Sequence, residues 1–337
     1  MIVFYILLAL LCLWGIRFRK AEKTDYLSKE QGNAVKGIFI LLVYLAHASV
    51  DLLDSGHVFS APGDSIYFWI QGQIGQLCVV MFLFFSGYGV MSSIISKGKD
   101  YVNTIPKHRA LGTLVNFDIA VVIFAVAGLI AGRKYPFSRY LLALTGWESI
   151  GNSNWYIFAI ILCYLSTWAS AKIVMAKGRD LKLVIPINLA FTLIMFVVFF
   201  FTRERHWYQT LFAYPLGLCF PFLKQKLDSI RTWRWLLLLM LALAVLAATY
   251  HKHQDPYYIV YTIRVLSFAI VWVLVLRRVK IGNPVLTWLG KNLFPLYIYQ
   301  RLPMMFVPKD NPYVFMVACL AITCLIVPLY RKIQVRL

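Results

Sequence analysis

The chain is poor in charge, and in acidic charge above all. Only 14% of its 337 residues are charged, and 14 acidic residues stand against 34 Lys and Arg. A soluble domain of this length needs a more polar surface, so a soluble globular protein is excluded. The composition is 61% hydrophobic, with a mean hydropathy of +0.70. Long apolar runs separated by short basic segments instead predict an all-α integral membrane protein.

Other absences exclude further kinds of site. The six cysteines all lie in apolar runs without metal-ligand spacing, so we expect no metal and no disulfide framework. There is no Gly-rich phosphate loop and no internal repeat, and no connection exceeds about twenty residues. The net charge of +20 would suggest nucleic acid in a soluble protein. Here membrane topology accounts for it, and we expect a lipid bilayer as partner and no nucleic acid.

Eleven apolar runs are long enough to cross a bilayer. They cover residues 2–17, 35–53, 73–95, 112–132, 154–172, 183–201, 207–223, 232–250, 258–276, 285–306 and 312–330. The first has no charged residue ahead of it and no small-residue cleavage site behind it, so we expect a retained span rather than a signal peptide. Pro295 and Pro303 interrupt the tenth run, as prolines often do beside a site.

The distribution of Lys and Arg predicts the orientation of these spans. Six alternate stretches, 17–36, 97–109, 172–182, 224–234, 277–291 and 331–336, carry 25 of the 34 basic residues. The intervening connections carry 7, and Arg264 and Arg301 lie within spans. Basic connections face the cytoplasm. We therefore predict a multi-pass protein of the cytoplasmic (inner) membrane, with its N-terminus outside and its C-terminus in the cytoplasm.

Ionisable residues inside the spans mark candidate sites, because each costs roughly 2.5–3.5 kcal/mol near the bilayer centre. His47 and Asp51 are four residues apart in the second span and share one helical face. A carboxylate beside an imidazole fixes its tautomer and raises its basicity, which makes a general base. The alternatives are a histidine that only bonds across helices and an aspartate that is simply solvated.

Further charged residues suggest a second set of contacts. Asp118 and Arg264 could form a structural ion pair, or the arginine could bind an acyl carbonyl or a phosphate. Lys107 and Arg109 belong to a basic cluster at the cytoplasmic mouth of the fourth span. Such a cluster serves either as an orientation signal that contacts lipid headgroups or as a binding site for the phosphates of a nucleotide-like ligand.

Four segments together carry a family resemblance. They are Asn33-Ala-Val-Lys-Gly followed by an apolar run to His47, Met81-Phe-Leu-Phe-Phe-Ser-Gly-Tyr-Gly89, Asn152-Ser-Asn-Trp-Tyr156, and Leu289-Gly-Lys-Asn-Leu-Phe-Pro-Leu-Tyr-Ile-Tyr299. In this order and spacing, over about four-fifths of the chain, they resemble the membrane acyltransferase-3 family.

The resemblance implies ten core helices. Residues 35–337 would then form a ten-helix acyltransferase domain, and residues 1–34 an extra N-terminal transmembrane helix with a basic cytoplasmic linker. It also implies an acyltransferase of groups other than aminoacyl groups, an acetyl-CoA-dependent O-acetyltransferase. The acyl group, usually acetyl, would pass from cytoplasmic acyl-CoA to a hydroxyl of a cell-envelope polysaccharide or lipid-linked sugar.

The resemblance also suggests roles for individual residues. His47 matches the family's essential histidine, with Asp51 as its predicted companion, and Lys107, Arg109 and Ser86 are the predicted donor contacts. The predicted substrate-lining residues are Trp155, Tyr156, Arg264, Asp118 and Gln300. The sequence departs from the family pattern where Gly112, Thr113 and Leu114 follow in place of a second arginine, and where Gln300 replaces a histidine.

Several alternatives remain open at this stage. His47 could act as a base for direct transfer or carry the acyl group itself. A transporter or flippase could use the same buried polar residues, although the two related halves common in transporters are missing. A catalytically idle scaffold is a third possibility.

Overall fold

The computed structural model describes residues 1–19, 25–250 and 258–337. Residues 20–24 of the predicted basic linker and the predicted connection at 251–257 lie outside the described residues. Within those ranges the helices are α1 (Val3–Leu13), α2 (Lys29–Asp54), α3 (Asp64–Ile74), α4 (Val80–Thr104), α5 (Gly112–Ile130), α6 (Phe137–Leu144), α7 (Trp155–Ala176), α8 (Val184–Thr202), α9 (Ala213–Ser229), α10 (Thr232–Tyr250), α11 (Tyr258–Arg278), α12 (Pro284–Lys291), α13 (Leu293–Tyr299) and α14 (Pro312–Ile333).

Short elements connect these helices. In the described ranges these include the 3₁₀-helices η1 (Gly75–Val79), η3 (Leu181–Leu183), η4 (Arg205–Trp207) and η5 (Pro303–Met305). The segment η2 (Ile105–Leu111) is a π-helix. The only strands in the described ranges, β1 (Arg17–Phe18) and β2 (Val279–Lys280), pair antiparallel with Arg17 opposite Lys280. The predicted all-α membrane class is therefore confirmed.

Seven helical stretches in the described part of the chain are long and apolar enough to cross a membrane. One of them runs continuously from Asp64 to Ile130 and holds both the third and the fourth predicted spans. Three predicted spans fall outside these stretches, because α1 has 11 residues, α9 has 17, and the run 285–306 is divided. The number of crossings, eleven in our reading, stays a prediction.

The divided run follows from its sequence. Pro284 begins α12, whose N-cap residue Asn283 accepts a hydrogen bond from the Leu286 N–H at 2.9 Å. The helix ends at Lys291, and α13 restarts with Pro295 in its first turn. Two short helices, α3 and α6, were not expected, because hydropathy over a span-length window does not detect helices of 11 and 8 residues.

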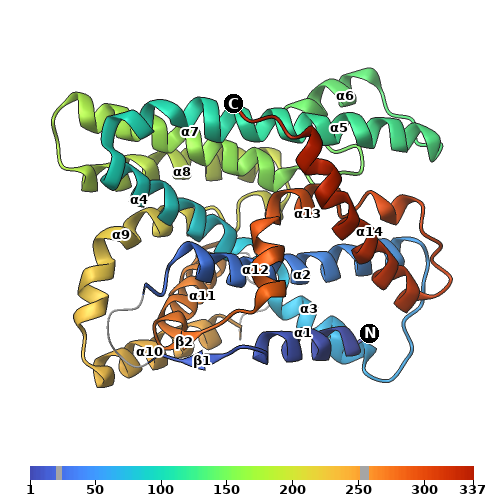
Figure 1. Cartoon of the computed structure of the whole chain (residues 1–337), viewed down its shortest axis with the longest axis horizontal. Helices are drawn as coiled ribbons and strands as arrows, with labels where there is room; N and C mark the ends of the chain where they lie inside the picture. Colours follow the sequence, from blue (N-terminus) through green and yellow to red (C-terminus); the bar gives the residue numbers. More distant parts are fainter. Residues whose placement is uncertain (20–24, 251–257) are drawn as a thin grey trace.

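The connections separate to two ends of the molecule (Figure 1). At the left of the view lie β1, β2 and the connections that follow α7 and α9, all in stretches rich in Lys and Arg. At the right lie the N-terminus and the connections α2–α3 and α5–α6. The ammonium of Met1 is paired there with the Asp64 carboxylate at 2.6 Å. The basic connections after α7 and α9 thus lie at the end away from the N-terminus, and which end faces the cytoplasm stays a prediction.

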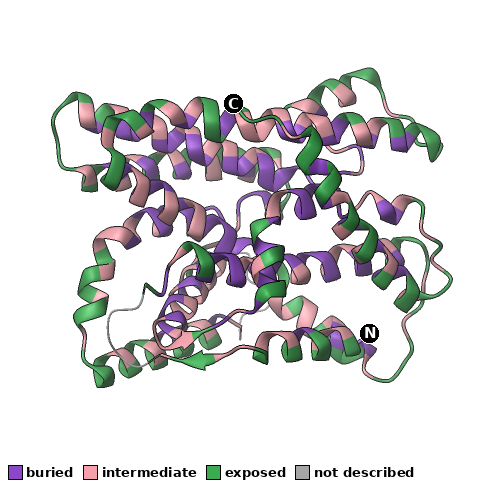
Figure 2. Cartoon of the chain, viewed as in Figure 1, coloured by how far each residue is buried: buried purple, intermediate pink, exposed green. Residues whose placement is uncertain are grey.

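Helix α2 is central in this bundle, whereas α10 lies at its edge (Figure 2). In the most apolar window of α2, 61% of the residues are buried, against 11% for α10. Exposed leucines, valines and phenylalanines cover the outward faces of the peripheral helices. Such surfaces suit lipid, because every backbone polar group inside a helix is already paired. Residues in the middle of α2 are therefore shielded from lipid by other helices.

Two glycines hold α12 tightly against α2. A Cβ on Gly37 would fall on the main chain of Leu286, and a Cβ on Gly290 would fall on the main chain of Asn33. Only glycine permits such close backbone approach. This contact fixes where α13 begins, and α13 carries the side chains that surround His47.

Candidate active site

His47 lies at the wall of a cavity of about 430 Å³, which we call the histidine pocket. Its lining comes from α2, α3, η1, α7 and α13, and includes Gln71, Trp155 and Tyr297. His47 is itself half-buried. The pocket therefore combines an imidazole with an apolar, largely protein-enclosed surrounding, which is where a base acts on a bound substrate.

Polar atoms around the pocket lack partners. His47 Nδ1, Gln71 Oε1 and Gln300 Oε1 are each buried with no hydrogen-bond partner among the described residues. The Gln300 side chain lies beside the imidazole, and its Nε2 donates to the Tyr297 carbonyl at 3.0 Å. Buried polar atoms are nearly always hydrogen-bonded in folded proteins. Two such atoms, on His47 and Gln71, belong to residues that line the histidine pocket, which suits a polar ligand or water there.

Aromatic rings form the rest of the wall. The ring centroids of His47 and Tyr297 are 6.5 Å apart, and those of Tyr156 and Tyr297 are 5.4 Å apart. Trp155 packs edge-on against Tyr156 at 6.0 Å. Packed rings restrict the rotamers of their neighbours, so the wall keeps its shape when a substrate enters. Of the predicted lining residues, Trp155, Tyr156 and Gln300 are thus gathered around His47.

Asp51 is engaged elsewhere. Its carboxylate Oδ2 lies 2.6 Å from Lys309 Nζ, at the boundary between α2 and the connection that leads to α14. Sharing a helical face with His47 therefore does not make it a bonded companion of the imidazole. Gln300, from α13, is the polar side chain that lies next to the ring.

We expect the Asp51→Asn variant to keep acyl-transfer activity within about threefold of the wild type, because a partly exposed ion pair contributes little. Lys309→Gln, which breaks the same pair from the other side, is the matched control. Initial rates of the purified variants test this expectation. A loss above about a hundredfold in Asp51→Asn alone would instead show that the carboxylate orients the base.

Asp118 and Arg264 lie apart from the histidine pocket and from each other. The Arg264 guanidinium donates to Thr249 Oγ1 at 3.3 Å and stacks on Tyr250 and Tyr261. Asp118 Oδ1 has no hydrogen-bond partner among the described residues, and the two side chains form no ion pair. Arg264 therefore joins α10 to α11, and the predicted ion pair is not formed.

A second histidine lies at the outer edge of the site. His206 in η4 packs against Trp155 with ring centroids 5.7 Å apart. Burial lowers the pKa of His206, and nearby Arg301 lowers it further against the opposing effect of Glu204. The imidazole is accordingly neutral at pH 7. Sequence analysis missed His206 and Gln71, although the run Gln71-Gly-Gln-Ile-Gly-Gln76 is conspicuously polar for the start of a span.

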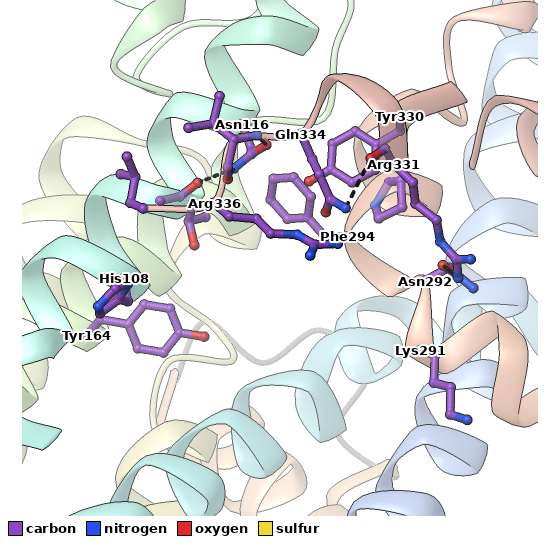
Figure 3. A pocket seen from close by; sticks show the side chains of 15 residues that line it. His108, Asn116, Tyr164, Lys291, Asn292, Phe294, Tyr330, Arg331, Gln334 and Arg336 are labelled. Atoms are coloured by element: carbon purple, nitrogen blue, oxygen red, sulfur yellow. Dashed lines mark hydrogen bonds between the residues drawn. The ribbon is translucent and has the colours of Figure 1, made fainter. Parts of the chain in front are cut away.

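A larger cavity of about 670 Å³ lies at the start of α5 (Figure 3). We call it the basic pocket, since Lys291, Arg331 and Arg336 line it together with His108. Of the predicted donor residues, Arg109 is not part of the lining; it lies beside Tyr101. Ser86 lies beside the hydroxyl groups of Tyr156 and Tyr164. Lys107 is exposed and is not among the residues that line this cavity.

The two pockets lie on the same helices. Tyr164 on α7 lines the basic pocket, and Trp155, nine residues earlier, lines the histidine pocket. At 1.5 Å per residue this is about 13 Å along the helix. On α13, Pro295 lines the first pocket and Tyr297 the second. Ser86 lies beside both Tyr156 and Tyr164, so these buried side chains connect the surroundings of the two pockets.

Comparison with known proteins identifies the family. The sequence pattern described as "Acyltransferase domain" matches residues 33–331. This chain belongs to that acyltransferase family. The match includes His47 and runs from within α2 to within α14, which confirms the predicted family. No curated protein and no solved structure matches the chain.

Family membership makes the chain a membrane acyltransferase, with an acyl donor and an acceptor as its reactants. The multiple apolar helices agree with a multi-pass membrane protein. In the described structure, His47 in the middle of α2 lines the histidine pocket, and the basic pocket lies further along α7, at Tyr164.

Proposed function

We propose that this acyltransferase moves an acyl group, in the simplest case acetyl, from cytoplasmic acyl-CoA to a hydroxyl of a cell-envelope polysaccharide or lipid-linked sugar. The observation that carries the proposal is the half-buried His47, with its unpartnered Nδ1, in a pocket that shares two helices with a basic pocket. An imidazole so placed can take a proton from a substrate hydroxyl.

The chemistry needs only groups that the site and the substrates supply. His47 accepts the hydroxyl proton, and the alkoxide oxygen attacks the thioester carbonyl carbon. The C–S bond breaks, the ester forms, and the thiolate of coenzyme A takes up the proton from the imidazolium. Gln300 beside the ring orients the imidazole, and the apolar wall of Trp155, Tyr156 and Tyr297 keeps bulk water from competing with the acceptor.

The basic pocket supports the choice of donor. Coenzyme A carries several phosphate charges at one end of a flexible chain and the thioester at the other. The phosphates suit Lys291, Arg331 and Arg336, and the chain would run past Tyr164 and Ser86 toward His47. The acceptor would enter the histidine pocket from the side of α3 and η4, where His206 and Trp155 meet.

The test is transfer of labelled acetyl from acetyl-CoA by purified protein in nanodiscs, with a crude envelope glycan fraction as acceptor. We expect label in an alkali-labile ester on the glycan and one free thiol of coenzyme A per ester. If labelled acetyl crossed the membrane of a proteoliposome and no ester formed on the glycan, the result would favour transport and contradict the proposal. Label that stays on the protein after denaturation would support a covalent acyl-histidine step in place of direct transfer.

A further inference from the structure

The basic pocket is lined by basic side chains and by no acidic side chain among its described residues. None of its fifteen described lining residues is Asp or Glu. Lys291, Arg331 and Arg336 come from three different places in the chain, the end of α12, the last turn of α14 and the segment after it. None of the three forms an ion pair with a described residue, whereas basic residues elsewhere in the described ranges do, as Arg203 with Glu148 and Lys309 with Asp51. Unpaired like charges around one cavity raise the local concentration of anions.

The segment after α14, residues 334–337, is fixed at the pocket by one side chain. The Asn116 amide donates to the Val335 carbonyl at 2.8 Å, and its Oδ1 accepts from the Val335 N–H at 3.0 Å. The same amide donates to the Gly112 carbonyl at 2.7 Å, so both its protons and its oxygen are used. Asn116 is buried in α5, and leaving its amide unpaired there would be costly. The Asn116 side chain therefore pairs with both the N–H and the C=O of Val335, as the backbone of a neighbouring strand would, and holds the segment against α5.

A hydrogen bond fixes Arg331, and Arg336 follows the segment that Asn116 holds. Arg331 donates to Asn292 Oδ1 at 2.8 Å, which keeps its guanidinium at the junction of α12 and α13. Figure 3 shows Arg336 extending along the pocket wall from the residues next to Asn116, with its guanidinium near Phe294. Basic side chains that only contact water or lipid headgroups at a membrane surface need no such hydrogen bonds to hold them. Two guanidinium groups at one cavity wall, of which that of Arg331 is held by a hydrogen bond, suit the binding of phosphate through paired donors.

We infer that residues 331–336, fastened by Asn116, form the phosphate-binding wall of the donor site, and that Arg331 and Arg336 bind the phosphates of the nucleotide end. This inference rests on the proposed function and gives its donor a specific place. Adenosine 3′,5′-bisphosphate, which carries the nucleotide end without thioester or thiol, is the probe that isolates this contact. Asn116 is a positioning residue here, because it acts only through the segment it holds.

Binding of the bisphosphate is measured by calorimetry on the full chain in phosphatidylcholine nanodiscs, whose headgroups carry no net charge. We expect Arg331→Gln and Arg336→Gln each to weaken binding about tenfold, since each removes one charge-assisted contact. Asn116→Leu should weaken it by a similar factor by releasing the segment. The matched control is Lys332→Gln, which removes the same charge from the next residue of α14, outside the pocket lining.

Kinetics give a second readout. The arginine variants should raise KM for acetyl-CoA and leave kcat at saturating donor close to the wild-type value, because Arg331 and Arg336 line the basic pocket and His47 lines the other one. Equal bisphosphate affinity in wild type, Arg336→Gln and Lys332→Gln would overturn the inference and leave the proposed function standing. The inference would also be overturned if the wild-type protein bound phosphatidylglycerol through Arg331 and Arg336 but did not bind the bisphosphate. A protein that transfers no acetyl and binds no coenzyme A would remove the proposed function itself.

Discussion

Replacing His47 with Gln should lower kcat for acyl transfer roughly 10²–10⁴-fold and leave the affinity for coenzyme A unchanged. Glutamine keeps a side chain of similar size and can still donate or accept a hydrogen bond, but it cannot take up a proton at neutral pH. The basic pocket, whose lining does not include His47, is not touched by this change. The measurements are initial rates with labelled acetyl-CoA and calorimetric binding of coenzyme A.

His57→Gln is the matched control for this variant. His57 lies in the connection that follows α2, where its ring packs on Phe59 with centroids 4.7 Å apart, and it does not line the histidine pocket. Its replacement should leave kcat at the wild-type value. A His47→Gln protein that is folded, binds coenzyme A and transfers acetyl at the wild-type rate would exclude His47 as the base. Gln300→Leu should cause a smaller loss, because it removes the neighbour of the imidazole rather than the imidazole itself.

The central helix and its histidine could be predicted from the sequence, and the partners of that histidine could not. A polar group within an apolar run of nineteen or more residues can be recognised from the sequence alone. Helical periodicity then placed Asp51 on the same face as His47. Which neighbour reaches the imidazole depends on other helices, however, and Lys309 and Gln300 lie more than 250 residues away along the chain. Periodicity within one helix carries no information about such contacts.

The residues of the basic pocket also could not be recognised as a site from the sequence. Lys291, Arg331 and Arg336 entered the sequence analysis only as charges that set topology, because short segments beside a span have no periodicity that reveals a site. The broken tenth span was different, since Pro295 and Pro303 act through local backbone chemistry: Pro295 lies in the first turn of α13, and Pro303 begins η5. Local rules predicted the elements, and the cavities arise from how distant elements pack.

Gly87→Ala should destabilise the protein by about 3 kcal/mol, which corresponds to a fall of roughly 6–12 °C in apparent melting temperature. Gly87 lies where α4 crosses α9, and a Cβ there would fall on the Tyr214 carbonyl oxygen and come within 3.1 Å of the Leu218 nitrogen. The contact is reciprocal, since a Cβ on Gly217 would fall on the Phe84 carbonyl oxygen. Backbone atoms cannot rotate aside as a side chain can, so the two helices must separate.

Gly89→Ala tests this argument two residues away on α4. A Cβ at Gly89 meets nothing within 4 Å, so alanine there should leave the melting temperature unchanged or raise it slightly. Separation of α4 from α9 would also strain the bond of 3.0 Å between the Tyr214 and Thr167 hydroxyls, which joins α9 to α7. Gly87→Ala should therefore lose acyl transfer at temperatures where Gly89→Ala retains it, because Ser86 on α4 lies beside Tyr164 on α7, which lines the basic pocket. Equal melting temperatures for the two variants, measured by thermal-shift size exclusion, would show that α4 and α9 are not in backbone contact.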